Sequence, residues 1–299
     1  MSDAGRAAAH RDAIAELGLE LNPDFIKATI GLTAPLVDPA ILDGVTVTSD
    51  IPYGDHERHV LDVYSSPELS GAPVVVYVHG GGFVAGQKAA PGSPYFGNIG
   101  GWAVRHGFVG VAINYRLAPE AQWPDGARDI GAALTWVVDR ISEHGGDPER
   151  IFLVGQSAGA MHVADYVAQP STHSRHGMAL AGAAIISCIY DLSRAEDKPI
   201  HRAYWGDDPA TWAEKSSLGP LLDVDLPLLL AVAEYDEPQF QQQAAWFVEA
   251  WTAKHGLYPP MHRLWGQNHL TSVYSIGTPY DTLGGLLEQF ITVNAGIRD

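Results

Sequence analysis

Ser157 has the residue type and the neighbours of a catalytic nucleophile. It is the centre of Gly-Gln-Ser-Ala-Gly at residues 155–159, which fits the pattern G-x-S-x-G. Apolar residues 151–154 predict a strand before it, and residues 158–169 predict a helix after it. Such a strand–turn–helix holds a serine on a sharp turn, where flanking glycines avoid a Cβ clash. The sequence therefore favours acyl transfer by a serine, although the short pattern alone is common.

A glycine-rich loop is predicted close to this serine. Three glycines follow His79, directly after apolar residues 74–78 that predict another strand. Backbone N–H groups without side chains in the way can approach a substrate oxygen, and with the N–H of Ala158 they would form an oxyanion hole. A phosphate-binding loop is the alternative, but this region has neither G-K-[ST] nor G-x-G-x-x-G with an acidic partner. We expect His79 to hold the loop rather than to act as a base.

Asp236 and His269 are the candidate acid and base that a serine nucleophile requires. In this strand–turn–helix architecture the acid and then the histidine follow the serine, on loops at the carboxyl ends of strands. Asp236 comes directly after the predicted strand 226–233, with Glu234 and Glu237 as alternatives. His269 closes the loop that follows the last predicted strand. The order along the chain therefore predicts a Ser-His-Asp triad.

The apolar runs predict the frame that positions these residues. Short β-branched runs alternate with helix-length segments, which is typical of parallel βαβ units, and the first two runs predict antiparallel strands. We therefore expect an α/β fold with a mostly parallel eight-stranded sheet and helices on both faces. The expected strands are 45–51, 59–64, 74–78, 109–114, 151–154, 183–186, 226–233 and 261–265, and the expected helices are 10–20, 23–32, 94–106, 125–144, 158–169, 238–255 and 280–293.

Two segments interrupt this alternation. Residues 1–43 are expected to form a small helical cap, and residues 44–299 the catalytic domain. Segment 190–222 is loop-rich and aromatic, which is consistent either with a lid over the strand ends or with a surface excursion. Phe25 in the cap is a candidate for closing the acyl site. The candidates for an aromatic pocket are Trp102, Trp123, Trp205 and Trp265.

Three motifs together resemble the hormone-sensitive-lipase-like branch of the α/β-hydrolases. They are H-G-G-G-F at 79–83, Y-R-L-A-P-E at 115–120 and G-Q-S-A-G-A at 155–160, followed by the downstream aspartate and histidine. The resemblance covers about residues 45–295. It implies the α/β-hydrolase fold, and it implies that the Y-R-L-A-P-E segment is structural and that its glutamate has no catalytic role.

The same resemblance assigns the site residues. It implies a triad of Ser157, His269 and Asp236. It also implies that the backbone N–H groups of Gly81 and Gly82, the second and third glycines of the loop, donate to the oxyanion together with the Ala158 N–H. No metal or organic cofactor is implied.

Some departures from that branch are similar to kynurenine formamidases. The usual G-D-S-A-G-G is G-Q-S-A-G-A here, and the stretches 236–243 and 268–272 resemble the formamidase group of the same superfamily. Both groups cleave an acyl bond with the same triad. The sequence therefore predicts the mechanism more sharply than the substrate.

Composition excludes several other function classes. The chain has 299 residues and a formal net charge of −17, which disfavours nucleic acid and anionic membranes as partners. Cys188 is the only cysteine, so no intramolecular disulfide forms, and we expect it to be a small buried hydrophobe. Neither a signal peptide nor a membrane span is predicted, so we expect a soluble, cytoplasmic protein. His56 and His59 lack H-E-x-x-H spacing, and no metal site is expected.

Three hypotheses about function remain at this stage. The first is a carboxylesterase that cleaves small or medium, neutral, largely apolar esters through an acyl-enzyme. The second is an arylformamidase-type amide hydrolase with a substrate like N-formylkynurenine. The third is a non-catalytic ligand receptor, which a missing triad residue would indicate. A homodimer is a further expectation, because dimers are common in the resembling family.

Overall fold

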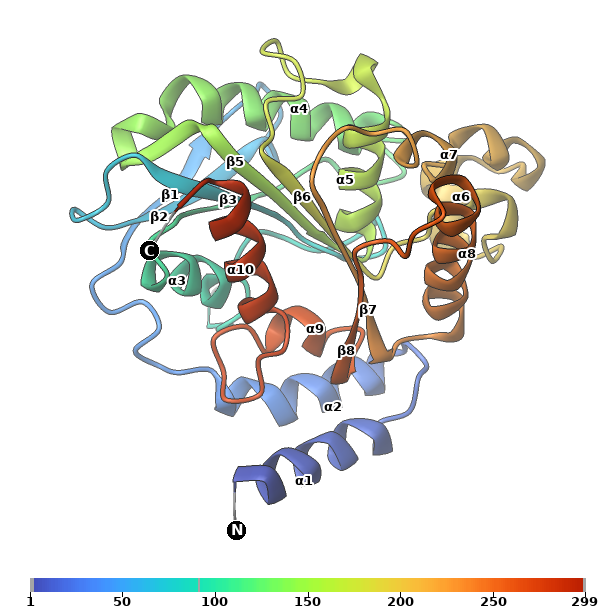
Figure 1. Ribbon diagram of the computed structural model, residues 1–299, viewed down its shortest axis with the longest axis horizontal. Coiled ribbons are helices and arrows are strands. Elements are labelled where there is room, and N and C mark those ends of the chain that lie inside the picture. Colours follow the sequence, from blue (N-terminus) through green and yellow to red (C-terminus); the bar gives the residue numbers. More distant parts are fainter. Residues whose placement is uncertain (1–2, 91, 298–299) are drawn as a thin grey trace.

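The computed structural model describes residues 3–90 and 92–297, and its centre is one eight-stranded sheet (Figure 1). The strand order is β1-β2-β4-β3-β5-β6-β7-β8. β2 runs antiparallel to both of its neighbours, whereas every pair from β4 to β8 in that order is parallel. The strands are β1 Thr46–Pro52, β2 Val60–Ser65, β3 Ala72–Val78, β4 Val109–Ile113, β5 Gly146–Gln156, β6 Gly182–Ile186, β7 Leu228–Tyr235 and β8 Met261–Asn268.

Helices cover both faces of this sheet, as Figure 1 shows. α3, α9 and α10 pack on one face, and α4, α5 and α8 pack on the other. The expected α/β-hydrolase fold, with its mostly parallel eight-stranded sheet, is confirmed. The α-helices are α1 Asp3–Glu16, α2 Pro23–Thr33, α3 Gly97–Arg105, α4 Asp125–Arg140, α5 Ala158–Ala168, α6 Pro199–Trp205, α7 Leu218–Leu221, α8 Pro238–His255, α9 Thr271–Tyr274 and α10 Gly284–Asn294.

The central strand β3 shows why the sequence builds two hydrophobic layers. All seven of its residues are buried. Val74, Val76 and Val78 point into the core under α4, α5 and α8, and Val75 and Tyr77 point into the core under α3, α9 and α10. Side chains alternate between the faces of a strand, so a strand covered on both faces is a continuous apolar run.

Most expected elements are present with shifted ends. β5 begins at Gly146 and continues to Gln156, so it is longer than the apolar run 151–154. The first helix ends at Glu16 rather than residue 20, and Gly18 follows it with a positive φ of 82°. A left-handed glycine just beyond a helix is a common way to end it.

The N-terminal segment lies against one end of the sheet. Figure 1 shows α1 and α2 (blue) beside the end of β8. The guanidinium of Arg11 on α1 donates to both carboxylate oxygens of Glu234, at 3.0 and 2.5 Å. The N–H of Leu21 donates to Glu237 Oε1 at 3.2 Å. The chain before residue 44 is therefore anchored to the residues around the end of β7.

Segment 190–222 contains more helix than its loop-rich sequence suggests. It includes α6, α7 and short 3-10 turns, and Tyr204, Trp205 and Trp212 are buried in it. The domain division at residue 44 and the assignment of this segment as a lid stay predictions. None of the helices among residues 3–90 and 92–297 has the length and apolar character needed to cross a membrane.

Candidate active site

Ser157 lies on the turn between β5 and α5, in a backbone conformation that the local glycines make possible. Its φ is +57° and its ψ is −125°, which are strained values for a non-glycine residue. A Cβ on Gly155 would lie 2.4 Å from the Gly159 carbonyl oxygen, and one on Gly159 would lie 2.2 Å from the Val78 oxygen. Both glycines of G-x-S-x-G are therefore required by close backbone contacts, as the motif predicts.

Ser157, His269 and Asp236 form one hydrogen-bonded chain. The Oγ of Ser157 is 2.8 Å from His269 Nε2, and His269 Nδ1 is 2.5 Å from Asp236 Oδ1. A carboxylate only accepts hydrogen bonds, so Nδ1 carries the proton and Nε2 is free to accept from the serine hydroxyl. The Asp236 side chain is fully buried and that of His269 is nearly so. The structure brings together the three residues that the sequence order singles out.

The second oxygen of Asp236 is held by two donors that the sequence analysis did not identify. Ser187 Oγ donates to Asp236 Oδ2 at 2.6 Å, and the Ala233 N–H donates to the same oxygen at 2.9 Å. Ser187 follows β6 directly and has a positive φ of 54°. The position of Ser187, directly after a predicted strand, is the sequence signal that could have indicated this contact.

Neighbouring side chains hold the loop that carries His269. The Gln156 amide Nε2 and the Ser272 hydroxyl both donate to the His269 carbonyl oxygen at 2.8 Å. Asn268 Oδ1 accepts from the N–H of Thr271 at 2.9 Å. The expected end of the last strand, at residue 265, is wrong, because β8 continues to Asn268. His269 is the first residue beyond the strand, and its backbone is fixed on both sides.

His79 holds the glycine-rich loop, as predicted, and is not in the triad. Its Nδ1 donates to the Gly80 carbonyl oxygen at 2.6 Å, and the Tyr115 hydroxyl donates to the carbonyl oxygen of His79 at 2.9 Å. The imidazole is stacked on the Tyr115 ring, with the centroids 4.4 Å apart. Burial lowers the pKa of His79 to about 4, so the ring is neutral at pH 7.

Gly81 and Gly82 line the same cavity as Ser157 and Ala158. Their φ values are +134° and +59°, and a Cβ on Gly81 would lie 2.0 Å from the Ala85 oxygen. Neither N–H has an acceptor within residues 3–90 and 92–297. The Ala158 N–H belongs to the first residue of α5, so it has no acceptor within the helix. These three donors are thus available to a ligand, and the oxyanion hole stays a proposal.

A cavity of about 770 Å³ opens over these groups. Its apolar wall includes Phe83, Phe96, Met161, Phe240 and Leu270. The Phe240 ring packs against the His269 ring with centroids 4.5 Å apart. The cavity is therefore large enough for a small or medium substrate and is apolar next to the triad.

The aromatic residues of this cavity are not the tryptophans expected from the sequence. Trp102 and Trp205 are buried in the core, and Trp265 is 59% exposed. Neither these residues nor Trp123 line the cavity. The expectation for Phe25 is also wrong, because Leu21 and Ile26 from the same segment line the cavity and Phe25 does not. The sequence did not indicate which aromatic side chains line the cavity.

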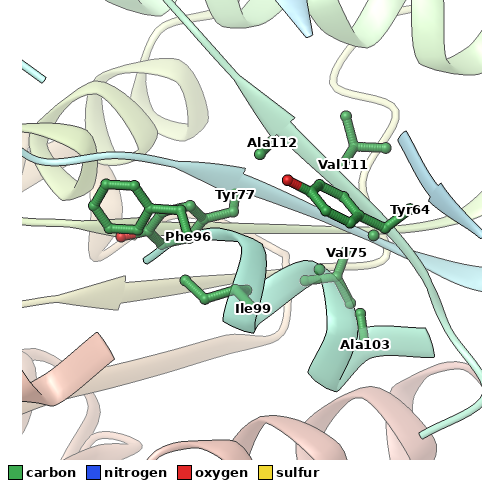
Figure 2. A pocket seen from close by; sticks show the side chains of 10 residues that line it. Tyr64, Val75, Tyr77, Phe96, Ile99, Ala103, Val111 and Ala112 are labelled. Carbon is green, nitrogen blue, oxygen red and sulfur yellow. The ribbon is translucent and has the colours of Figure 1, made fainter. Parts of the chain in front are cut away.

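A second cleft lies under α3, away from the triad. Figure 2 shows it between Tyr64, Tyr77, Phe96 and Ile99. It has no room for a water molecule, and a Cβ on Gly100 would lie 2.3 Å from the Tyr64 ring. The cleft is a closely packed contact between α3 and the sheet, not a binding site.

The alternative acids have other partners. Glu234 binds Arg11 and accepts from the Gly266 N–H at 2.8 Å, and the Arg11 hydrogen bond lowers its pKa. Glu237 binds Lys198 at 3.2 Å. Neither carboxylate is hydrogen-bonded to His269. Asp236 is therefore the carboxylate that orients His269.

Two glutamines of the stretch that resembles formamidases have structural roles. Gln241 Nε2 donates to the Asp236 carbonyl oxygen at 2.8 Å. Gln243 Oε1 accepts from the N–H groups of Tyr190 and Asp191, at 3.0 and 2.8 Å. These contacts attach α8 to the acid loop and to segment 190–222. The similarity in this stretch therefore has an explanation that requires no shared substrate.

Other titratable side chains are not part of the triad. Burial raises the pKa of the Cys188 thiol, so this residue is a poor nucleophile. His162 Nδ1 is 3.1 Å from the Tyr204 hydroxyl, and burial lowers the pKa of His162 to about 3. Burial raises the pKa of Asp165 to about 8. His56 is paired with Glu120 at the surface, at 3.2 Å.

Comparisons with known proteins agree with this fold. A sequence model described as "alpha/beta hydrolase fold" matches residues 75–251. Esterase LipQ of Mycobacterium tuberculosis is 36% identical over 162 residues, which are 50% of this chain and 37% of LipQ. Probable carboxylic ester hydrolase LipM of the same organism is 32% identical over 220 residues, which are 66% of this chain and 50% of LipM. The chain thus spans half or less of the length of these curated relatives.

Solved structures share the fold at low sequence identity. Esterase B of Lactobacillus rhamnosis superposes with a TM-score of 0.73 at 18% identity, over 97% of both chains. A thermostable esterase of Pseudomonas putida superposes with a TM-score of 0.68 at 20% identity, over 96% of this chain and 95% of that one. These similarities extend over nearly the whole chain, including the segments outside residues 75–251.

Proposed function

This chain belongs to the alpha/beta hydrolase fold family, and on that premise we propose that it hydrolyses carboxylic esters through an acyl-enzyme on Ser157. The observation that carries the proposal is the hydrogen-bonded chain from Asp236 through His269 to Ser157, together with the partly apolar cavity that Ser157 and His269 line. The curated relatives named as esterases support the same activity.

The first half of the reaction forms the acyl-enzyme. Ser157 Oγ attacks the ester carbonyl carbon while its proton moves to His269 Nε2. Asp236 Oδ1 accepts from Nδ1 and stabilises the imidazolium that results. The same proton then moves from Nε2 to the alcohol oxygen as the carbon–oxygen bond breaks. One proton is thus carried from the nucleophile to the leaving group.

The negative charge of the tetrahedral intermediate falls on the former carbonyl oxygen. The N–H groups of Gly81, Gly82 and Ala158 are the donors for it, and loss of one such donor reduces kcat by about 100- to 1000-fold. Ala158 adds the favourable field of the α5 N-terminus. In the second half of the reaction water attacks the acyl carbon while His269 Nε2 takes its proton, and this proton passes to Ser157 Oγ as the bond between that oxygen and the acyl carbon breaks.

The cavity also supports the proposed substrate size. Its volume of about 770 Å³ accommodates small and medium esters, and its wall near His269 is apolar. The formal net charge of −17 disfavours anionic substrates. We therefore propose neutral esters as the substrate class. A formamidase activity on N-formylkynurenine stays the alternative, because the same triad can cleave an amide.

The test is hydrolysis of p-nitrophenyl butyrate by the wild type and by Ser157→Ala. The variant should lose essentially all turnover, and it should no longer react with a fluorophosphonate probe. Ser142→Ala is the matched control, because Ser142 is exposed in the turn after α4 and should keep both properties. Retained turnover in Ser157→Ala would refute the assignment. A specificity constant for N-formylkynurenine well above that for the ester would favour the amidase.

A further inference from the structure

We propose that Gln239 and His201 form a polar subsite in the catalytic cavity. This subsite selects esters that carry a neutral group, such as a hydroxyl, which can both donate and accept a hydrogen bond. This inference rests on the proposed function and names its substrate class more closely. Both side chains line the cavity, and they are only 4% and 3% exposed. Gln239 lies on α8 and His201 on α6, and both side chains form hydrogen bonds with the backbone of Glu196.

The backbone of Glu196 fixes the amide of Gln239. Its N–H donates to Gln239 Oε1 at 2.6 Å. A backbone N–H can only donate, so the amide oxygen must be the atom that faces it. The amide nitrogen, with its two hydrogens, is therefore the free end of the side chain. It has no hydrogen-bond partner within residues 3–90 and 92–297.

The same peptide segment fixes the tautomer of His201. His201 Nδ1 is 2.6 Å from the Glu196 carbonyl oxygen, which can only accept, so Nδ1 carries a proton. Burial lowers the pKa of His201, so the ring is neutral and Nε2 presents a lone pair. Nε2 has no hydrogen-bond partner in the described part of the chain. The cavity wall thus has one unused donor and one unused acceptor, both on rigidly held side chains.

Neither of these nitrogens is sealed inside the protein. Fully enclosed polar atoms without a partner do occur among the described residues, for example His79 Nε2 and His162 Nε2, but the free nitrogens of Gln239 and His201 are not among them. Both nitrogens therefore keep some accessible surface, and a ligand with a matching donor and acceptor can reach them.

The chemistry of the subsite is neutral rather than ionic. Lys198 is the lysine of the cavity wall, and its Nζ is already 2.9 Å from Glu196 Oε2 and 3.2 Å from Glu237 Oε2. Its charge is therefore engaged by two carboxylates. A hydroxyl group, which both donates and accepts, matches the two free nitrogens without the desolvation of an ion.

The subsite is close to the catalytic residues. Gln239 immediately precedes Phe240, whose ring packs on His269. The His201 ring lies 6.4 Å from the ring of Phe83 in the glycine-rich loop, measured between centroids. A group bound by Gln239 and His201 thus lies within the same cavity as the scissile ester. The pocket expected from the sequence to be largely apolar thus also has polar side chains, at Gln239 and His201.

The test compares pairs of esters that differ by one hydroxyl. Propyl butyrate and 3-hydroxypropyl butyrate place it on the alcohol, and ethyl butyrate and ethyl 3-hydroxybutyrate place it on the acyl group. The wild type should have a kcat/KM about tenfold higher for the hydroxylated member of at least one pair. Each ester is also titrated calorimetrically into Ser157→Ala protein, so that binding is measured without turnover.

Two variants change the free nitrogens and keep the anchors. His201→Asn keeps a donor for the Glu196 carbonyl, because an Asn amide nitrogen can occupy the position of Nδ1, and it removes Nε2. Gln239→Glu keeps an oxygen for the Glu196 N–H and replaces the free donor by an acceptor. Each should lower the hydroxyl preference, as a ratio of kcat/KM and as a ratio of Kd, by about tenfold. His144→Asn and Gln169→Glu are the matched controls outside the cavity and should keep the ratio.

The outcomes separate the subsite from the proposed esterase activity. Equal kcat/KM and Kd for both members of each pair in the wild type overturn the subsite, even if all four esters are cleaved. A preference that persists in both variants also overturns it. If no ester is cleaved but Ser157→Ala binds the hydroxylated members more tightly and the variants in that background do not, the subsite stands and the esterase activity fails.

Discussion

Replacing Asp236 by asparagine should abolish most catalysis without disturbing the fold, because the surroundings dictate how the new amide is oriented. Ser187 Oγ and the Ala233 N–H both donate to Oδ2, so the amide oxygen of the asparagine must occupy that position. The amide nitrogen then faces His269 Nδ1, which lies 2.5 Å from Oδ1 in the wild type. An amide nitrogen donates, so it forces the imidazole proton onto Nε2.

This tautomer points an N–H at the hydroxyl of Ser157 instead of a lone pair. The histidine can no longer accept the serine proton, and the same change of tautomer in serine proteases lowers kcat by about 10⁴-fold. That loss corresponds to about 5 kcal/mol of transition-state stabilisation. The amide is nearly the same size as the carboxylate, so the loss should appear in kcat, with the thermal midpoint changed little.

The assay is hydrolysis of p-nitrophenyl butyrate at pH 7.5, with circular dichroism to confirm folding. Asp225→Asn is the matched control, because Asp225 is exposed before β7 and should leave kcat unchanged. Ser187→Ala removes one donor to Asp236 but does not change the tautomer, so it should cost at most about 100-fold. A folded Asp236→Asn protein that retains a tenth of the wild-type kcat would refute the reasoning.

Three further predictions concern the glycine-rich loop, the nucleophile turn and a buried carboxyl. Gly81→Ala places a Cβ 2.0 Å from the Ala85 oxygen, so the loop must shift. The kcat for p-nitrophenyl butyrate, measured on folded protein, should fall by about 100-fold or more. A normal kcat would contradict the role of the Gly81 N–H as a donor. Gly159→Ala places a Cβ 2.2 Å from the Val78 oxygen and should lower the free energy of unfolding by about 3 kcal/mol or more, measured by urea denaturation; a loss below 1 kcal/mol would contradict the packing argument. Burial raises the pKa of Asp165 from 3.8 to about 8. Between these two pH values the folded protein keeps a proton that the unfolded chain releases, so the free energy of unfolding of the wild type falls as pH rises. Asp165→Asn removes this effect, so its stability relative to the wild type should rise between pH 5 and 7.5 by up to about 1.4 kcal/mol per pH unit; an equal difference at both pH values would contradict it.

The sequence alone determined the parts of this protein that depend on local pattern. The strand–turn–helix around Ser157 is encoded within a dozen residues, because the turn needs glycines on both sides and the flanking runs need their own periodicity. The alternating layers of the sheet follow from continuous apolar strands between helices. The positions of Asp236 and His269 follow from the rule that functional loops lie at the carboxyl ends of parallel strands.

Only the tertiary structure decided which side chains support that machinery. Ser187 and Asp236 are 49 residues apart and Gln156 and His269 are 113 apart, so nothing in the local sequence pairs them. The set of residues that line the cavity, which excludes the expected tryptophans, likewise depends on how distant segments come together. The two free nitrogens depend on the contacts that α6 and α8 each make with the backbone of Glu196. Local propensity sets where a strand or helix forms, but hydrogen-bond partners distant in sequence become neighbours only when the sheet and its connections are complete.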